Sequence, residues 1–247
     1  KTVTTSGYTI SGTDSGNYSL TQPTTTANIT AATLTVTGVT ANNKTYNANT
    51  TATLSATGSL SGVISGDTVT LSAASVTASF ADKNVGTGKT VTTSGYTISG
   101  TDSGNYSLTQ PTTTANITAA TLTVTGATAN NKTYNANTTA TLSATGSLSG
   151  VISGDTVTLS STGVTASFAD KNVGTGKTVT TSGYTISGTD SGNYSLTQPT
   201  TTANITAATL TVTGVTANNK TYNANTTATL SATGSLSGVI SGDTVTL

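Results

Sequence analysis

The sequence predicts an all-β protein whose tandem, antiparallel, Ig-like β-sandwich domains are stacked end to end as a rod. The first observation behind this prediction is a repeat of fixed length, because KTVTTSGYTISGTDSGNYSL begins at Lys1, at Lys89 and at Lys177. The second is that apolar residues alternate with threonine in short runs, which is typical of half-buried strands. The third is that glycine, asparagine and aspartate separate these runs, as they do in the turns of a sandwich.

The repeat sets the expected domain boundaries. Two complete copies occupy residues 31–118 and 119–206, and they differ at four positions. Residues 1–30 match the C-terminal part of a repeat, and residues 207–247 match the N-terminal part. We therefore expect two whole domains and two partial ones, cut from a longer tandem array.

The first half of a repeat is expected to hold three strands. In Thr33–Val39, Leu34 and Val36 lie on one face and the threonines on the other, and Gly38 is expected to mark a bulge or the strand end. The next two strands are Thr51–Ala56 and Thr68–Ser72. A turn at Asn42–Asn49 separates the first strand from the second. A loop at Gly58–Asp67, with one helical turn over Val63–Ile64, separates the second from the third.

The second half is expected to hold four strands. They are Val76–Ala81, Lys89–Ser99 with a bulge near Gly95, a short strand around Tyr106 and Leu108, and Thr112–Thr118. The stretches Asp82–Gly88 and Gly100–Asn105 are expected to be turns, because glycine, asparagine and aspartate favour them. Pro111 restricts its segment to an edge strand or a strand end.

The junction between copies, Thr112–Gly126, contains no proline, no charge run and no glycine before its last residue. Flexible linkers are rich in glycine and serine, and stiff spacers are rich in proline. We therefore expect the last strand of one domain to continue into the first strand of the next. At roughly 3.3 Å per residue, each repeat would add about 35–40 Å to a rod.

A β-solenoid is the alternative fold. Apolar residues fall 20 to 24 positions apart, a plausible coil length, at Leu34, Leu54, Val76, Ile98 and Leu122. A solenoid rises about 4.8 Å per coil, so one repeat would then advance only about 20 Å. The coils of a solenoid resemble one another, and these segments do not, so the sandwich is the favoured prediction.

Composition excludes several functions. The chain of 247 residues carries eight lysines and eight aspartates, net charge zero, and no arginine, glutamate, histidine or cysteine. It therefore offers no disulfide, no usual zinc or haem ligands, and no basic face for nucleic acid. Without histidine or an activated nucleophile we expect no enzyme and no cofactor. The chain has no run of about 18 apolar residues, so we expect no membrane insertion of this segment.

Three carboxylates in each repeat are the metal candidates. Calcium needs six to eight oxygen ligands, and Asp67, Asp82 and Asp102 could supply some of them if they converge. Turn formation is the simpler interpretation of each. The sequence around Gly88-Lys89-Thr90 resembles the end of a phosphate-binding loop, but Lys83 stands where its first glycine belongs and a strand follows. A Lys–Asn isopeptide crosslink assisted by Asp82, from Lys83 or Lys89, is a further hypothesis.

Asn-x-Ser/Thr sequences are candidate glycosylation sites on an exported surface. In one period they fall at Asn105, Asn116, Asn131 and Asn137. A chain this rich in asparagine and threonine also produces them by chance.

The order NKTYNANTTATLSATGSLSGVISGDTVTL from Asn43 to Leu71, followed by ASFADKNVGTGKTV and ISGTDSGNYSL, resembles the YDG-type repeat of large secreted bacterial surface proteins, including filamentous-haemagglutinin-like adhesins. The likeness spans nearly the whole repeat. The motif that names the family falls at Tyr46-Asn47-Ala48, where the aspartate and glycine are replaced. The resemblance implies a repeat unit of an extracellular stalk or fibre without activity of its own.

The functional expectation is therefore a structural repeat of a long extracellular bacterial stalk or filament, which gives reach and stiffness for surface attachment or cell–cell association. Its expected partners are neighbouring repeats and other copies of itself in a fibre, because edge strands with few lysines have little protection against pairing. The alternative is an adhesive module for glycan or for host or biofilm matrix, with tyrosines 46, 96 and 106 as contacts and avidity from the repeats.

Overall fold

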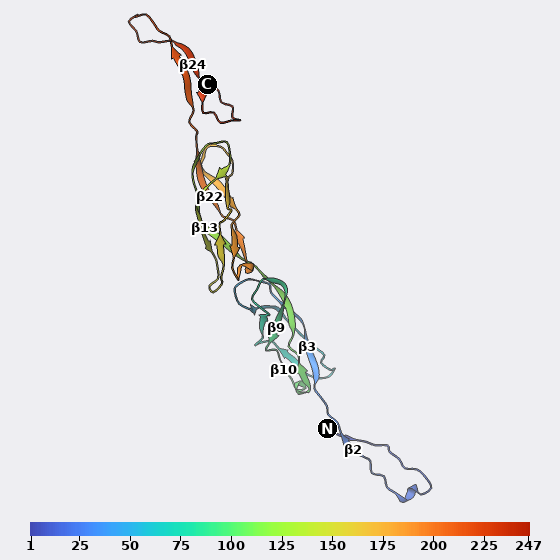
Figure 1. Cartoon of the computed structure of the whole chain (residues 1–247). Coiled ribbons are helices and arrows are strands. Elements are labelled where there is room, and N and C mark those ends of the chain that lie inside the picture. The colour runs from blue at the N-terminus through green and yellow to red at the C-terminus, as the bar shows by residue number, and fades with distance from the viewer. The chain divides into compact units, whose positions relative to one another are not determined.

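The computed structural model describes residues 1–247 and is all-β, with three short 3-10 helices as its only helical elements (Figure 1). It divides into two compact units. Unit 1 comprises Lys1–Lys44 and Asn49–Ile117, and unit 2 comprises Thr45–Ala48 and Thr118–Leu247. The tyrosine-bearing turn Thr45–Ala48 is thus grouped with the repeat that follows it in sequence.

The two complete repeats have the same elements. The first contains β3 (Ala32–Ala41), β4 (Lys44–Thr45), β5 (Thr51–Ala52), β6 (Leu54–Ser61), β7 (Thr70–Ser72), β8 (Thr77–Phe80), β9 (Gly86–Ser94), β10 (Thr97–Ser99), η2 (Ser103–Asn105), β11 (Tyr106–Leu108) and β12 (Thr112–Thr118). The second contains β13 (Ala120–Ala129), β14 (Lys132–Thr133), β15 (Thr139–Ala140), β16 (Leu142–Ser149), β17 (Thr158–Ser160), β18 (Thr165–Phe168), β19 (Gly174–Ser182), β20 (Thr185–Ser187), η3 (Ser191–Asn193), β21 (Tyr194–Thr197) and β22 (Thr200–Thr206).

The partial repeats form less. The N-terminal one contains β1 (Thr2–Thr4), η1 (Ser15–Asn17) and β2 (Thr24–Thr26), and the C-terminal one contains β23 (Thr211–Ala217) and β24 (Leu230–Ser237). Each makes a single two-stranded sheet. Two strands alone bury little apolar surface, which explains why the side chains of these segments are mostly exposed.

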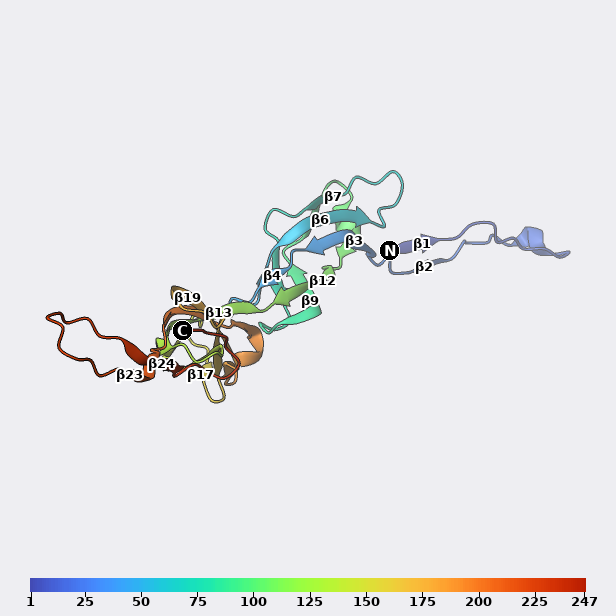
Figure 2. The same cartoon turned by 90° about the horizontal axis from the view of Figure 1, so that it is seen from above.

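Each complete repeat builds three sheets. In the first repeat their strand orders are β4-β12-β9-β8-β5, β11-β3-β6 and β10-β7. Figure 2 shows β12 beside β9 and β3 beside β6 in unit 1. Most ladders are antiparallel, as predicted, but β11 pairs with β3 in parallel, and so do the equivalent β21 and β13. Each three-stranded sheet is therefore mixed.

The five-stranded sheet is nearly closed into a barrel, and its edge strands β4 and β5 follow one another in the chain. Lys44 Nζ spans the turn between them and donates to the Asn49 carbonyl (2.8 Å), to Asn49 Oδ1 (2.9 Å) and to the Thr51 carbonyl (3.1 Å). Its ammonium also lies 5.6 Å from the centre of the Phe80 ring. Partial burial lowers the pKa of Lys44. One lysine therefore links the two open edges of this sheet.

The core follows the predicted alternation. Leu34, Val36, Val91, Phe80 and Ile117 are buried. In the second repeat the five-stranded sheet encloses one buried cluster, with Ala140, Phe168, Val179, Ala203 and Ile205 as its members. Figure 1 shows β13 and β22 of unit 2 close to one another. The small number of large apolar residues gives each repeat a thin core.

Several local predictions are wrong. Gly58–Asp67 is not a loop throughout, because β6 runs through Gly58 to Ser61, and Val63–Ile64 forms no helical turn. Gly58 keeps the strand continuous by adopting φ +74° opposite Gly38, where an added Cβ would lie 2.5 Å from the Thr37 carbonyl oxygen. The predicted strand Thr51–Ala56 divides at Thr53 into β5 and β6. The bulge or strand end expected at Gly38 is absent too, because β3 continues to Ala41 and the register shift falls between Thr40 and Ala41.

The long strand predicted over Lys89–Ser99 is interrupted where a bulge was expected. Gly95 has φ +91°, β9 ends at Ser94 and β10 begins at Thr97. The junction prediction also agrees with the structure at the first boundary, since only Ala119 separates β12 from β13. At the second boundary the gap is longer, because β22 ends at Thr206 and β23 begins at Thr211.

Substitution of Gly100 by alanine is expected to destabilise the first repeat by about 1–3 kcal/mol, because a Cβ there would be strained. Gly100 has φ +119°, and an added Cβ would lie 2.3 Å from the Thr68 carbonyl oxygen. Gly104→Ala is the matched control, since nothing lies within 4 Å of a Cβ there. Urea unfolding followed by circular dichroism measures both variants, and equal losses from the two would contradict this account.

Candidate functional site

The turn that carries Tyr46 is held in place by backbone geometry. Ala48 adopts φ +61°, which reverses the chain between β4 and β5. The Tyr46 amide donates to the Thr118 carbonyl at 2.8 Å. The equivalent strand of the second repeat, β14, pairs in parallel with β22, with Lys132 opposite Ile205. This pairing positions the tyrosine at the C-terminal end of the last strand of its own repeat.

Within unit 2, Tyr46 meets an aspartate and a second tyrosine. Its hydroxyl donates to Asp155 Oδ2 at 2.8 Å, and the Tyr194 hydroxyl donates to the same oxygen at 2.6 Å. The two rings are 5.4 Å apart between centroids and 76° apart in plane, an edge-to-face contact. The Tyr194 hydroxyl also accepts from the Ile152 amide at 3.1 Å. We call Tyr46, Asp155 and Tyr194 the tyrosine joint.

The electrostatics of the joint favour neutral tyrosines around one carboxylate. Burial and the hydrogen bond to Asp155 raise the pKa of Tyr194 to about 12. The equivalent Tyr106 donates to Asp67 at 2.6 Å, and this bond, with burial, raises the pKa of Tyr106. Hydrogen bonds to a charged acceptor are shorter and stronger than those between neutral groups. A single carboxylate, that of Asp155, therefore accepts hydrogen bonds from both tyrosine hydroxyls and holds them together.

A second tyrosine–aspartate contact, equivalent to that between Tyr46 and Asp155, lies further along unit 2. The Tyr134 hydroxyl donates to Asp243 Oδ1 at 3.1 Å, and Lys171 Nζ lies 3.6 Å from the same oxygen. Tyr134 is one repeat after Tyr46, and Asp243 is one repeat after Asp155. The contact therefore recurs with the period of the sequence.

Raising the pH from about 10 to about 12 is expected to weaken the tyrosine joint. A tyrosine in the unfolded chain ionises near pH 10, whereas the pKa of Tyr194 in the fold is about 12. Because the folded value lies above the unfolded one, its stabilising contribution is complete below pH 10 and is lost as the pH rises toward 12. Urea midpoints across this range measure the loss, and Tyr194→Phe should reduce the slope. A flat profile in the unchanged chain would be inconsistent with the joint.

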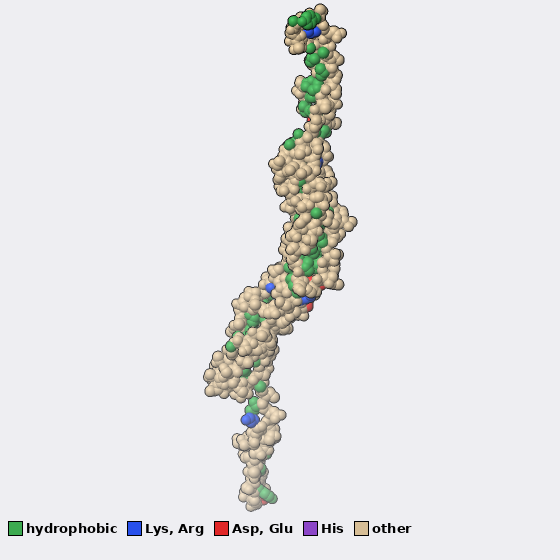
Figure 3. Space-filling model, turned by 90° about the vertical axis from the view of Figure 1, so that its left-hand side faces the viewer, with side chains coloured by type: hydrophobic (Ala, Val, Ile, Leu, Met, Phe, Trp, Pro, Cys, Tyr) green, Lys and Arg blue, Asp and Glu red, His purple; other side chains and the backbone are tan.

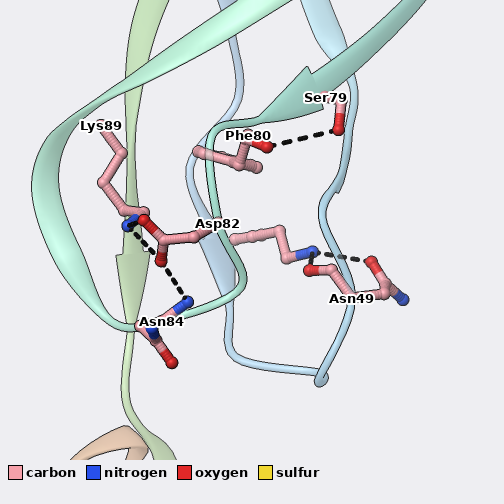
Figure 4. Close-up of polar contacts among 7 residues, drawn as sticks. Asn49, Ser79, Phe80, Asp82, Asn84 and Lys89 are labelled. Atoms are coloured by element: carbon pink, nitrogen blue, oxygen red, sulfur yellow. Dashed lines mark hydrogen bonds and ion pairs between the residues drawn. The ribbon is translucent and has the colours of Figure 1, made fainter.

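The calcium candidates are engaged with protein donors. Asp67 accepts the Tyr106 hydroxyl, and Asp102 Oδ2 accepts the Thr68 amide at 2.8 Å, so these two lie on neighbouring segments. Asp82 lies in the turn before β9 (Figure 4). The structure contains no group of three or more residues with metal-binding side chains.

Asp82 forms the main ion pair of its repeat. Lys89 Nζ lies 2.7 Å from Asp82 Oδ1 and 2.8 Å from Oδ2, and the Asn84 amide donates to Oδ1 at 2.8 Å (Figure 4). The Lys89 contact, supported by the Asn84 amide, lowers the pKa of Asp82. The carboxylate is half open to water, unlike the buried setting that the isopeptide hypothesis needs. Lys89 lies in β9, as expected for a strand and not for a phosphate-binding loop.

Of the candidate glycosylation sites, Asn105 lies in η2, Asn116 lies within β12, and Asn131 and Asn137 lie in turns. Asn105, Asn131 and Asn137 are exposed, and Asn116 is half-buried. Three of these side chains accept hydrogen bonds: Asn116 from the Gly88 amide, Asn131 from the Asn204 amide, and Asn137 from Lys132 Nζ and the Thr139 amide. These amides therefore shape the local backbone.

The three tyrosines considered for glycan contact are buried. Tyr46 and Tyr96 are each 3% exposed and Tyr106 is 7% exposed. The Tyr96 hydroxyl donates to the Thr57 carbonyl at 2.9 Å. Sequence reasoning missed the partner of Tyr46, because Asp155 lies 109 residues away in the next repeat. The usable signal was a tyrosine and an aspartate, Tyr46 and Asp67, that both recur with the period of the sequence.

The fold and the joints together define a class: a tandem all-β repeat protein in which a tyrosine from one repeat is hydrogen-bonded to an aspartate of the next. The family model for the YDG domain matches residues 30–115, 118–203 and 206–247. The chain therefore belongs to the YDG domain family. Searches of curated proteins and of solved structures return no match. None of its helices has the length and apolar character needed to cross a bilayer.

Proposed function

We propose that the chain is a structural segment of a long extracellular bacterial stalk or filament, as in filamentous-haemagglutinin-like adhesins. The observation that carries the proposal is the tyrosine joint, because it ties Tyr46 of one repeat to Asp155 of the following one. The single residue between β12 and β13 supports it as well, since one residue allows little independent movement. Repeat number would then set reach.

The finer architecture belongs to the same proposal. Each repeat acts as an Ig-like sandwich module, and successive modules are stacked end to end as a rod. The two periodic joints, at Asp155 and Asp243, support a regular arrangement. Strand pairing within each module would resist extension, and each joint would limit bending.

The surface suits exposure to changing surroundings. Most side chains on the face drawn in Figure 3 are neither hydrophobic nor charged. Only 6% of residues are charged, and the net charge is zero. A surface of threonine, serine and asparagine changes little with salt or pH, because few of its groups titrate or are screened.

Two measurements test the proposal. Small-angle scattering of the chain should give about 35–40 Å per repeat, from the rise of an extended strand, and independently tumbling domains would contradict the rod. Immunoelectron microscopy of the source cells, with antibodies against the chain, should label surface fibres whose length falls when repeats are deleted. Label confined to the cell interior would refute the stalk.

Adhesion to glycan or matrix is the alternative. The burial of Tyr46, Tyr96 and Tyr106 does not favour it, because stacking on a sugar needs an accessible ring face. A glycan array with the chain separates the two: specific, repeat-dependent binding would support the adhesive module, and its absence would favour the stalk.

A further inference from the structure

The tyrosine joint brings two phenol rings together at their hydroxyl ends. The hydroxyls of Tyr46 and Tyr194 donate to one oxygen, Asp155 Oδ2, at 2.8 Å and 2.6 Å, so both hydroxyl groups face the same point. The ring centroids are 5.4 Å apart, within the contact range of aromatic pairs. In a phenol the ortho carbons are bonded to the carbon that carries the oxygen. The ortho positions of both rings therefore lie close to the shared carboxylate oxygen.

Both rings are shielded from water and held in place by the surrounding backbone. Tyr46 is 3% exposed and Tyr194 is 7% exposed. The Tyr46 amide donates to the Thr118 carbonyl, and the Tyr194 hydroxyl accepts from the Ile152 amide. Two groups that a fold holds in contact react with each other much faster than with groups on other molecules, because their encounter needs no further loss of translational freedom. The joint is therefore arranged for reaction of one ring with the other.

The composition of the chain directs oxidation to tyrosine. Cysteine, methionine, tryptophan and histidine are the other side chains that oxidants attack readily, and the sequence contains none of them but nine tyrosines. Loss of one electron and the hydroxyl proton from a phenol leaves a phenoxyl radical whose unpaired electron is shared with the ortho carbons. An oxidant that reaches this chain therefore acts first on tyrosine and produces radicals that couple through carbon.

Asp155 supplies the base that this oxidation needs. Burial and the hydrogen bond to Asp155 raise the pKa of Tyr194 to about 12, so this ring is a neutral phenol near pH 7 and must lose a proton together with its electron. That proton already lies on a hydrogen bond to the Asp155 carboxylate, and the proton of Tyr46 points at the same oxygen. A positioned base that accepts a proton in this way typically accelerates a reaction by about 10²–10⁴-fold.

We propose that Tyr46 and Tyr194 are the site of an oxidative dityrosine crosslink, formed when a one-electron oxidant from outside the protein takes one electron from each ring. Each phenol gives its hydroxyl proton to Asp155, which releases the first proton to water before it accepts the second. The two radicals form one C–C bond between their ortho carbons. The hydrogen on each of these carbons then moves to the phenol oxygen of its ring. The oxidant gains two electrons in all, and two protons pass to water.

The crosslink joins one repeat to the next, because Tyr46 belongs to the first complete repeat and Tyr194 to the second. It converts a contact made of hydrogen bonds, which open reversibly, into one that opens only when a C–C bond breaks. The inference rests on the contact geometry within unit 2 and on neither a surface location nor a stalk. Failure of the crosslink would therefore leave the proposed function to its own tests, and the reverse also holds.

Photo-oxidation of the purified chain tests the proposal. A photoexcited ruthenium tris-bipyridyl complex serves as the one-electron oxidant, and persulfate is the final acceptor, which takes two electrons and becomes two sulfate ions. The chain is kept dilute, so that coupling between separate molecules is slow. The product should show the blue fluorescence of dityrosine and should still migrate as a single chain in a denaturing gel.

Tryptic digestion locates the bond. Trypsin cleaves after lysine, so it releases Tyr46 in residues 45–83, as their only tyrosine, and Tyr194 in residues 178–220. Mass spectrometry should find the two peptides linked, with a mass two hydrogen atoms below the sum of the separate peptides. Because residues 2–44 have the same sequence as residues 178–220, variants are needed to identify the second ring.

Four variants make that identification. Tyr46→Phe and Tyr194→Phe keep the rings but remove one phenol each, and either should abolish the linked pair. Tyr184→Phe is the matched control and should leave the yield unchanged, because this tyrosine is also in residues 178–220 and 3% exposed but donates to the Thr145 carbonyl. Asp155→Asn removes the base at nearly constant size and should slow the crosslink by about tenfold or more.

Tyr222 shows whether the oxidant has acted, because it is 89% exposed. If Tyr222 is consumed while residues 45–83 stay unlinked, the proposal is wrong. The same linked pair in the Tyr194→Phe chain would also refute it, since a different ring would then be the partner. An unchanged rate in the Asp155→Asn chain, with an unchanged circular dichroism spectrum, would remove Asp155 from the reaction.

Discussion

Replacement of Asp155 by alanine should destabilise unit 2 by about 2–4 kcal/mol, because each hydrogen bond to a charged acceptor contributes about 1.5–3 kcal/mol and two bonds that share one acceptor add up to less than their sum. Two hydroxyls, from Tyr46 and Tyr194, lose their common acceptor in this variant. The Tyr194 hydroxyl would still accept the hydrogen bond from the Ile152 amide. Urea unfolding measures the loss, and amide hydrogen exchange at Tyr46 locates it.

The matched variant is Asp67→Ala, at the equivalent position of unit 1. Asp67 accepts the hydroxyl of Tyr106, with no second tyrosine in its cavity. Its loss should therefore be smaller, because one hydroxyl and not two loses its acceptor. Tyr46→Phe combined with Asp155→Ala completes a double-mutant cycle. If the two aspartate variants lost equal stability, Tyr46 would contribute nothing to the joint.

Much of the fold was predictable because the two-residue alternation of apolar residues with threonine is enough to identify the strands and their buried faces. Leu34 and Val36 were assigned to the buried face from alternation, and both are buried. Periodicity fails where glycine enters a strand. Gly58 looked like the start of a loop, yet its positive φ allows β6 to continue opposite β3. Glycine marks unusual backbone geometry both in a loop and inside a continuous strand, and the sequence alone does not tell these two structures apart.

The joint was not predictable, for a different reason. Tyr46 and Asp155 are separated by more than one repeat, and no local pattern connects them. The parallel pairing of β11 with β3 is equally non-local, because it joins the beginning and the end of one repeat. Asp102 lies in the predicted turn, but its carboxylate accepts the Thr68 amide 34 residues away, and Asp67 accepts the Tyr106 hydroxyl 39 residues away. Turn propensity reveals neither of these tertiary contacts.

Leu122→Ala should destabilise the second repeat by about 2–5 kcal/mol, the usual cost of a large-to-small change in a core. Leu122 is fully buried in β13, opposite Leu196 of β21, and one of its methyl carbons lies 3.4 Å from the position of a Cβ on Gly150. A thin core has few neighbouring side chains that can shift into the space, so most of the cavity should remain. Thermal unfolding followed by circular dichroism measures the effect.

The repeats supply their own controls for this substitution. Leu34→Ala removes the equivalent, equally buried side chain of the first repeat and should cost the same. Leu210→Ala removes the equivalent side chain of the C-terminal partial repeat, which is half-buried and has no strand like β21 beside it. Its cost should be well under half, because the transfer and cavity contributions both scale with burial. Equal losses at all three leucines would mean that strand pairing, and not the buried side chain, decides the stability of each repeat.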